Sequence, residues 1–134
     1  MIVALLVLGR LAADGDGRDG GLTRRTRTAR AARDRARALL RLHLDAVQRA
    51  ELDTTHSFIV TAPSGHRYRI ATRVPFNVHD ETAGIDYCVQ FVDENGFGLY
   101  VPVEDLMLAQ KILLETDEHE FLSIANKRRV EKAA

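Results

Sequence analysis

The chain has 134 residues, 46% of them hydrophobic, and its 19 basic side chains balance 19 acidic ones at a formal net charge of +0. This length allows one domain with a single core and excludes two domains of ordinary size, while the lone cysteine, Cys88, excludes an intramolecular disulfide framework and a cysteine-based zinc cluster. The apolar run of residues 1–8 is shorter than the roughly 20 residues that span a bilayer, so we expect a cytoplasmic protein with no membrane partner.

The charges are distributed unevenly along the chain. Residues 1–56 contain 11 arginines and 7 acids, residues 57–126 contain 4 basic and 11 acidic residues, and residues 127–134 contain 4 basic residues and 1 acid. The three net charges are therefore +4, −7 and +3, which sum to 0. Such segregation favours either an anionic partner for the two ends or contact between the unlike halves of two copies.

The N-terminal residues lack the pattern of a folded element. Residues 9–21 mix glycine, aspartate and arginine without a period of apolar side chains, which is typical of disorder. We expect residues 1–28 to be a disordered leader, or upstream sequence translated ahead of the true start. Residues 29–126 are then the single domain, and residues 127–134 form a basic tail.

A helical period follows the leader. Between Ala29 and Ala50 apolar residues recur along one stripe, with arginines on the opposite side, which indicates an amphipathic helix. His43 falls within the stripe, where we expect a neutral imidazole bonded to a backbone carbonyl. Asp45 and Gln48 have the spacing of a capping box, so the segment is either one rod or two helices joined near residues 43–45.

The middle of the chain has strand signals. Alternating or β-rich runs separated by turn residues predict four or five antiparallel strands. The predicted strands cover residues 57–62, 66–70, 76–79, 85–92 and, after Asn95-Gly96, residues 97–101. One face of this sheet is apolar, with candidate core residues Phe58, Val60, Tyr68, Ile70, Tyr87, Val89 and Phe91.

Two short helices are predicted at the C-terminal end. Pro102 suits the first turn of a helix, and Glu104 and Asp105 complement its positive end. Leu106, Ala109, Leu113 and Leu114 are predicted to face the core across from a polar stripe that contains Glu104 and Lys111. Gln110 lies among these leucines, so its amide should bond a neighbouring strand or turn. Asp117 and Glu120 have capping-box spacing and start the second helix, which contains Phe121.

The segment L-A-Q-K-I-L-L-E-T-D-E-H-E-F-L-S-I-A-N, residues 108–126, resembles the ending of uncharacterised small proteins encoded by bacteria and their phages. The likeness extends over roughly residues 36–126 and includes G-x-R-Y-R-I at residues 65–70 and N-V at residues 77–78. It implies a bacterial or phage origin and brings no activity with it.

The candidate functional residues are a row of arginines. Arg30, Arg33, Arg37 and Arg41 repeat at intervals of three and four, so their guanidinium groups lie along one side of a helix, where they could bridge successive phosphates. The alternative is a solvated helix face in a chain that prefers arginine to lysine. The row lacks aromatic stacking groups, and no named DNA-reading motif is present.

The sequence gives little support for a metal site or for a catalytic cysteine. His66, His79, Asp80 and Glu81 could be imagined around a metal, but their spacing matches no recognised binding pattern. Cys88 with His79 would need a lowered thiol pKa and an orienting third group to act as a nucleophile and base. We therefore expect no catalytic residue, no metal, no cofactor and no small-molecule substrate.

The sequence predicts an α+β domain: an antiparallel meander of four to five strands, with an N-terminal amphipathic helix and two C-terminal helices packed on one face. Its function is predicted to be that of a non-catalytic interaction or regulatory module that binds a protein partner or itself. The alternative is a nucleic-acid-binding accessory protein that uses the arginine row. An enzyme with an unrecognised site ranks third.

Overall fold

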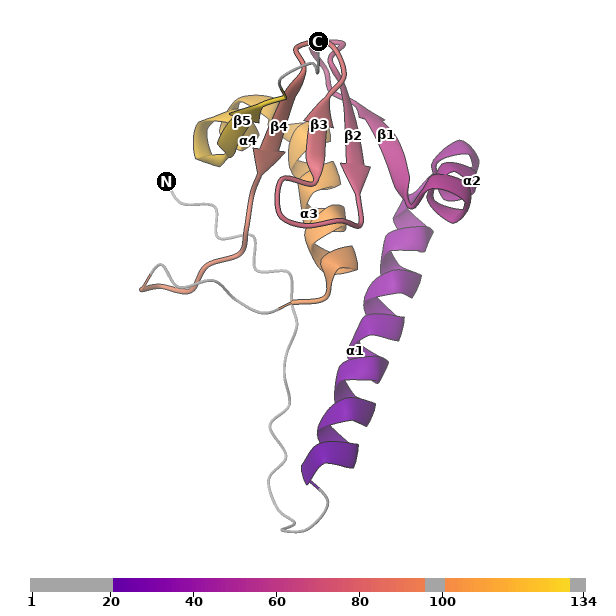
Figure 1. The fold of residues 1–134 in the computed structure, drawn as a ribbon. Helices are drawn as coiled ribbons and strands as arrows, with labels where there is room; N and C mark the ends of the chain where they lie inside the picture. Colours follow the sequence, from indigo (N-terminus) through magenta and orange to yellow (C-terminus); the bar gives the residue numbers. More distant parts are fainter. Residues whose placement is uncertain (1–20, 96–100, 131–134) are drawn as a thin grey trace.

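A computed structural model describes residues 21–95 and 101–130 (Figure 1). The predicted α+β class is confirmed, with a five-stranded antiparallel meander in the order β1-β2-β3-β4-β5. The elements in chain order are α1 (Gly21–His43), α2 (Ala46–Thr55), β1 (Ser57–Thr61), β2 (Arg67–Ala71), β3 (Val78–Asp80), β4 (Ile85–Cys88), α3 (Val103–Thr116), α4 (Glu118–Ile124) and β5 (Asn126–Arg129). Among the described helices, none is long and apolar enough to cross a membrane.

The fifth strand is not where the sequence predicted it. Val101 is not in a strand, and the rest of that predicted strand falls on residues 96–100, which lie outside the described part. Instead, Asn126–Arg129 pair with β4, so residues 127–129 of the predicted basic tail are part of the sheet. Opposite charges favour this pairing, because Arg128 stands across from Asp86 and its Nη2 donates to the Asp86 carboxylate at 3.3 Å. All four residues of β5 are exposed, and charged side chains are typical of a free sheet edge.

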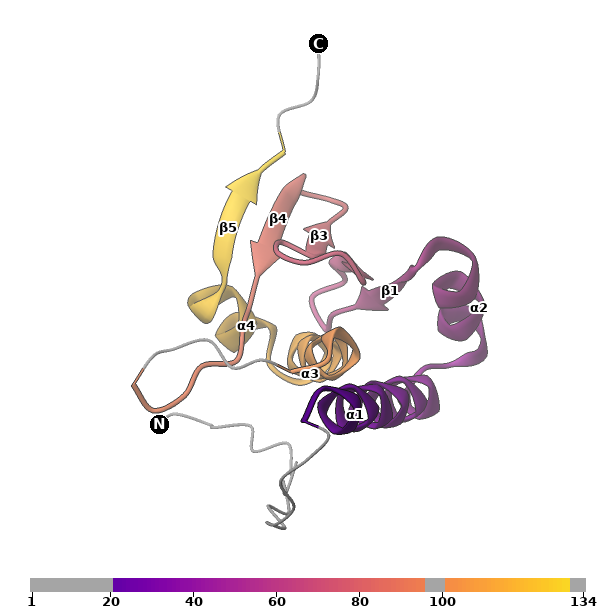
Figure 2. The same ribbon diagram turned by 60° about the horizontal axis from the view of Figure 1, so that its bottom comes forward.

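The elements stack in three layers, which Figure 2 shows from below. Helix α3 covers one face of the sheet, and α1 packs on the side of α3 that faces away from the sheet. The C-terminal half of α1 joins the core through Leu40, and Leu44, which follows the helix, joins the core beside it. The other fully buried core side chains come from the sheet and the C-terminal helices: Phe58, Val60, Tyr68, Ile70, Val78, Met107, Leu114 and Phe121.

The N-terminal helix begins earlier than predicted, and it ends before α2, which is a separate helix. Helix α1 starts at Gly21, eight residues before the predicted start at Ala29. It ends at His43, and Asp45 then caps α2 through a complete capping box with Gln48, which confirms the two-helix alternative. His43 lies where the chain turns and is exposed, so its predicted place on the core-facing apolar stripe is wrong.

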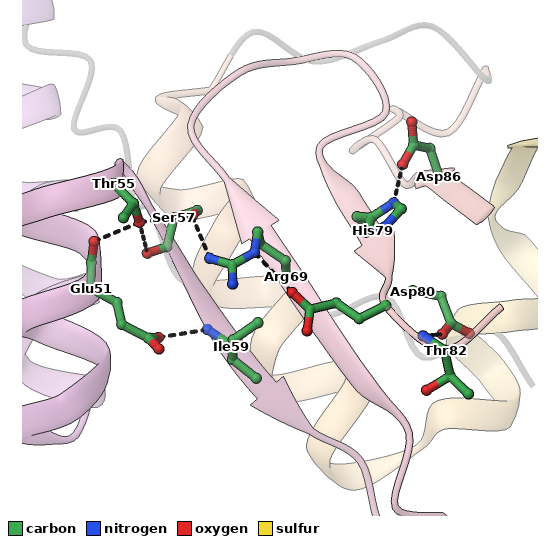
Figure 3. A network of polar contacts seen from close by, with 10 residues as sticks. Glu51, Thr55, Ser57, Ile59, Arg69, His79, Asp80, Thr82 and Asp86 are labelled. Atoms are coloured by element: carbon green, nitrogen blue, oxygen red, sulfur yellow. Dashed lines mark hydrogen bonds and ion pairs between the residues drawn. The ribbon is translucent and has the colours of Figure 1, made fainter. Parts of the chain in front are cut away.

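Helix α2 protects the outer edge of the sheet. The Ile59 backbone N–H on β1 donates to Glu51 Oε2 at 3.0 Å, and the Ile59 carbonyl accepts from Gln48 Nε2 at 2.8 Å (Figure 3 shows the Glu51 contact). A strand at a sheet edge otherwise leaves such groups open to pairing with another chain. Two side chains of one helix therefore close this edge at β1.

Helix α3 is anchored to the sheet by a buried pair of amides. Gln110 is 1% exposed, and its Nε2 donates to Asn77 Oδ1 at 2.9 Å while Asn77 Nδ2 donates to Gln110 Oε1 at 2.7 Å. Gln110 Nε2 also donates to the Val89 carbonyl at 3.4 Å, and Asn77 Nδ2 to the Ala71 carbonyl at 3.1 Å. The predicted bonding of Gln110 to a strand or turn is confirmed, because Asn77 lies immediately before β3.

The polar stripe predicted on α3 is open to solvent only at its C-terminal end, where Glu115 is exposed. Glu104 and Lys111 are both buried, because α1 covers this side of α3. The Glu104 carboxylate lies 3.7 Å from Arg37 of α1, and Lys111 Nζ donates to Glu115 at 2.6 Å. Burial beside the Glu104 carboxylate raises the pKa of Asp105 above its usual value. The last turn of α3 ends where Asp117 caps α4, accepting the Glu120 N–H at 3.0 Å.

Candidate nucleic-acid interface

The N-terminal part of α1 is a basic arm that extends beyond the rest of the fold (Figure 1). We define this basic arm as residues 21–35, which carry six arginines and one aspartate for a net charge of +5. From residue 24 on, where the side chains of α1 are described, the first buried one is Ala36, so this part of the arm precedes the contact with α3. Its six arginines are all exposed: Arg24, Arg25, Arg27, Arg30, Arg33 and Arg35.

The composition of the arm accounts for its helical state. Alanine and arginine are among the strongest helix formers, and together they supply nine of the fifteen residues of the arm, against three β-branched threonines. Thr28 Oγ1 donates to the Arg24 carbonyl at 2.9 Å, so that side chain bonds within the helix. Ala36 and Leu40 are buried, and they continue the same helix into the domain along the side that contacts α3. The arm is thus a continuation of a helix that the domain anchors at its other end.

The four arginines of the predicted row divide into two groups. Arg30 and Arg33 lie on the basic arm and are exposed, whereas Arg37 and Arg41 lie on the half of α1 that packs against the domain. Arg37 Nη2 is 3.7 Å from Glu104 of α3. Arg41 makes a bidentate contact with Asp53 of α2, at 2.5 and 3.2 Å. That contact lowers the pKa of Asp53 and raises the pKa of Arg41.

Sequence reasoning therefore selected two arginines that have partners inside the fold and missed four that are exposed on the arm. The missed residues are Arg24, Arg25, Arg27 and Arg35. The available signal was the density of eight arginines against one aspartate over residues 23–41. A row on one helix face includes only some of these residues, because the arginines lie on all sides of the helix.

The open face of the sheet carries a second polar group of residues (Figure 3). The register places Ile59, Arg69, His79, Asp86 and Arg128 side by side on five successive strands. Arg69 Nε donates to Glu81 at 3.0 Å and its Nη1 donates to Ser57 Oγ at 3.0 Å. His79 Nδ1 is 2.7 Å from one oxygen of Asp86, whose other oxygen accepts from Arg128. The two arginines of this row are thus each paired with a carboxylate, Arg69 with Glu81 and Arg128 with Asp86.

The residues considered for a metal are held by different partners. His79 pairs with Asp86, whereas His66 Nδ1 lies 3.3 Å from Asp80. Asp80 is buried and also accepts the Thr82 and Ala83 N–H groups at 2.8 and 2.9 Å, so it holds the turn after β3. Glu81 binds Arg69 instead. The four residues are divided among three separate contacts, and Cys88 is buried at the end of β4.

A cluster of aromatic rings joins the sheet to α4. The rings of Tyr68, Tyr87 and Phe121 lie with centroids 5.9 to 6.4 Å apart. The Tyr68 hydroxyl donates to Glu118 Oε1 at 3.1 Å, and the same carboxylate accepts from Ser64 Oγ in the turn between β1 and β2. Burial and the neighbouring Glu118 carboxylate raise the pKa of Tyr68 well above its usual value, and burial also raises the pKa of Tyr87.

We expect these tyrosines to make the fold sensitive to alkali. A tyrosine whose pKa is raised on folding stabilises the protein fully below its unfolded pKa of about 10 and progressively less as the pH rises above that value. Urea midpoints should therefore fall above about pH 10, and they should fall less steeply in Tyr68→Phe. Tyr87→Phe is the matched control, because the pKa of Tyr87 is raised less than that of Tyr68 and its removal should change the alkaline slope less. An unchanged alkaline slope in Tyr68→Phe would show that the hydroxyl ionises normally.

No protein-family model, curated protein or solved structure matches this chain.

Proposed function

We propose that this protein is a non-catalytic interaction module, of bacterial or phage origin, whose basic arm binds the phosphate backbone of nucleic acid. The observation that carries the proposal is the position of six exposed arginines on one helical segment that extends from the domain. The basic arm has a net charge of +5, which attracts a polyanion. Arginine binds phosphate through paired N–H donors.

The distribution of the arginines favours phosphate contacts over base reading. They lie on several sides of the helix, as positions 24, 25, 27, 30 and 33 do at 3.6 residues per turn. A helix of this kind fits the major groove of duplex DNA, which is about 12 Å wide, with arginines directed toward both phosphate walls. The arm contains no asparagine, glutamine or aromatic residue that would read or stack on bases. Because the arginines point to several sides of the helix and most of them meet phosphates, binding should depend strongly on salt and little on sequence.

The rest of the domain supports a binding role without catalysis. The histidines at positions 66 and 79 each contact a carboxylate, on different parts of the sheet. These pairs stabilise turns and strand pairing, which accounts for the residues without invoking a reaction. The arginines of the sheet face are likewise paired with Glu81 and Asp86.

The proposal predicts that Arg30→Gln/Arg33→Gln weakens binding to a short fluorescent duplex by about tenfold near 50 mM salt. A plot of log affinity against log salt concentration should become shallower by about 2, because each arginine removed no longer neutralises a phosphate and each phosphate accounts for about one unit of slope. Both side chains are exposed, so stability should be unchanged. Fluorescence anisotropy between about 50 and 200 mM salt measures both quantities.

The matched control is Arg67→Gln/Arg73→Gln, which removes the same charge from exposed positions of β2 and the following loop. The control should bind almost as tightly as the wild-type chain. An equal decrease of affinity in the two double variants would assign binding to net charge instead of the arm. Absence of binding at low salt, or binding that salt does not weaken, would refute the proposal.

A further inference from the structure

The first turn of α3 contains a buried carboxylate that is only partly satisfied. Glu104 is the second residue of α3, and its side chain is 10% exposed because α1 packs beside it (Figure 2). Its Oε1 lies 3.7 Å from Arg37 Nη2, whereas its Oε2 is buried and has no hydrogen-bond partner among the described residues. Buried carboxylates usually accept hydrogen bonds on both oxygens. Glu104 therefore depends on a neighbouring cation to offset its charge.

Arg37 of α1 is that cation. In the part of the chain that the structure describes, no other basic side chain lies within ion-pair distance of Glu104. Lys111, which is also buried on α3, donates to Glu115 instead. The Arg37 side chain is 58% exposed, so it contacts the buried carboxylate and still reaches solvent. This one guanidinium is thus available both to a group inside the fold and to a ligand outside it.

Arg37 also continues the row of arginines that starts on the basic arm. Arg30, Arg33 and Arg37 follow one another at intervals of three and four residues, so they lie along one side of α1. A phosphate backbone that follows Arg30 and Arg33 toward the domain would reach Arg37 next. Two anions can therefore compete for the Arg37 guanidinium, the Glu104 carboxylate and a phosphate group of the bound nucleic acid.

The burial of Glu104 decides this competition. If Arg37 turned to a phosphate, Glu104 would remain buried without a compensating charge, which is strongly unfavourable. A single phosphate contact in water gains less, because solvent and salt screen it. We propose that Glu104 is an autoinhibitory competitor of phosphate, which holds Arg37 and confines nucleic-acid binding to the basic arm. This regulation rests on the nucleic-acid binding proposed above.

The test is the substitution Glu104→Gln, which keeps the size of the side chain and removes its charge. Binding to a short fluorescent duplex should become about threefold to tenfold tighter near 50 mM salt, because Arg37 is released to contact one more phosphate. The plot of log affinity against log salt concentration should become steeper by about one. Arg37→Gln should leave the slope of the wild-type chain nearly unchanged, but it should remove the added slope when combined with Glu104→Gln.

The matched control is Asp105→Asn, which removes the same charge from the same turn of α3. The control should change the affinity by less than twofold and leave the slope unchanged. Urea midpoints verify that each variant is folded, and Glu104→Met replaces Glu104→Gln if the glutamine variant does not fold.

The outcomes separate this regulation from the binding on which it depends. An equal gain in Glu104→Gln and Asp105→Asn would assign the effect to net charge and overturn the competition. An unchanged slope in a folded Glu104→Gln variant would also overturn it, while salt-dependent binding of the wild-type chain would leave the proposed function in place. A wild-type chain that does not bind the duplex at low salt would refute both.

Discussion

Replacing Phe121 with alanine should destabilise the fold by about 3 to 5 kcal/mol, the range found for large aromatic side chains removed from a core. Phe121 is fully buried, and it is the only side chain of α4 that is buried. Its ring lies 6.3 Å from Tyr68 and 5.9 Å from Tyr87, so truncation removes both ring contacts and leaves a cavity. Since a domain of this size has about 5 to 15 kcal/mol in total, the destabilisation should be visible in the urea midpoint.

The same substitution should also loosen β5, because α4 leads into that strand through Ala125. Hydrogen exchange of the β4 and β5 amides measures this effect separately from global unfolding. Leu122→Ala is the matched control on the same helix, and its 39% exposure predicts a cost below about 1 kcal/mol. Phe121→Leu provides a milder version if the alanine variant does not fold. Equal costs for Phe121→Ala and Leu122→Ala would mean that α4 is not held by the aromatic cluster.

Much of the fold could be predicted because its elements have local signals. The capping residues Asp45 and Asp117 mark helix starts by bonding the N–H groups three residues later, and that spacing is visible in the sequence. The alternation in β1 and β2 is visible in the same way, since Phe58 and Val60 pair with Ile70 and Tyr68 on the buried face.

The strand β5 could not be predicted because it has no such signal. Asn126–Arg129 has low β-propensity and no apolar side chain, so it resembles a basic tail. Its strand state comes from pairing with β4, a contact between residues about 40 positions apart in the chain, such as Asp86 and Arg128. Edge strands with lysine and arginine are common, but only the tertiary arrangement reveals that this segment is one.

The basic character of α1 could be read from the sequence, but only some of the arginines exposed on it were selected. The arginine density on α1 is visible in the sequence, but the ion pairs of Arg37 and Arg41 join helices whose arrangement the sequence does not give. The same limit applies to Glu104, which was predicted in a solvated stripe and is buried under α1. Charged residues on a helix mark its solvent side only until a further helix packs there.

The buried amide pair gives the second large prediction. Gln110→Met keeps the volume of the side chain but removes its donor and acceptor, so the Asn77 oxygen loses the Gln110 donor that it has now. A buried polar group left without its partner costs about 1 to 3 kcal/mol, and Asn77→Leu should cost a similar amount by removing the other side of the pair. Urea unfolding of the two variants, with the wild-type chain as reference, measures both values.

The double variant Gln110→Met/Asn77→Leu separates hydrogen bonding from simple packing. If the amides stabilise each other, the double variant should be more stable than the sum of the single effects predicts, by about 1 kcal/mol or more, since no lone amide remains to be desolvated. The hydrogen bond from Asn77 to the Ala71 carbonyl is absent from both variants that change Asn77, so it cancels in the cycle. Additive effects would mean that the two amides act independently. In that case the attachment of α3 to the sheet would rest on Met107 and Leu114, which are fully buried.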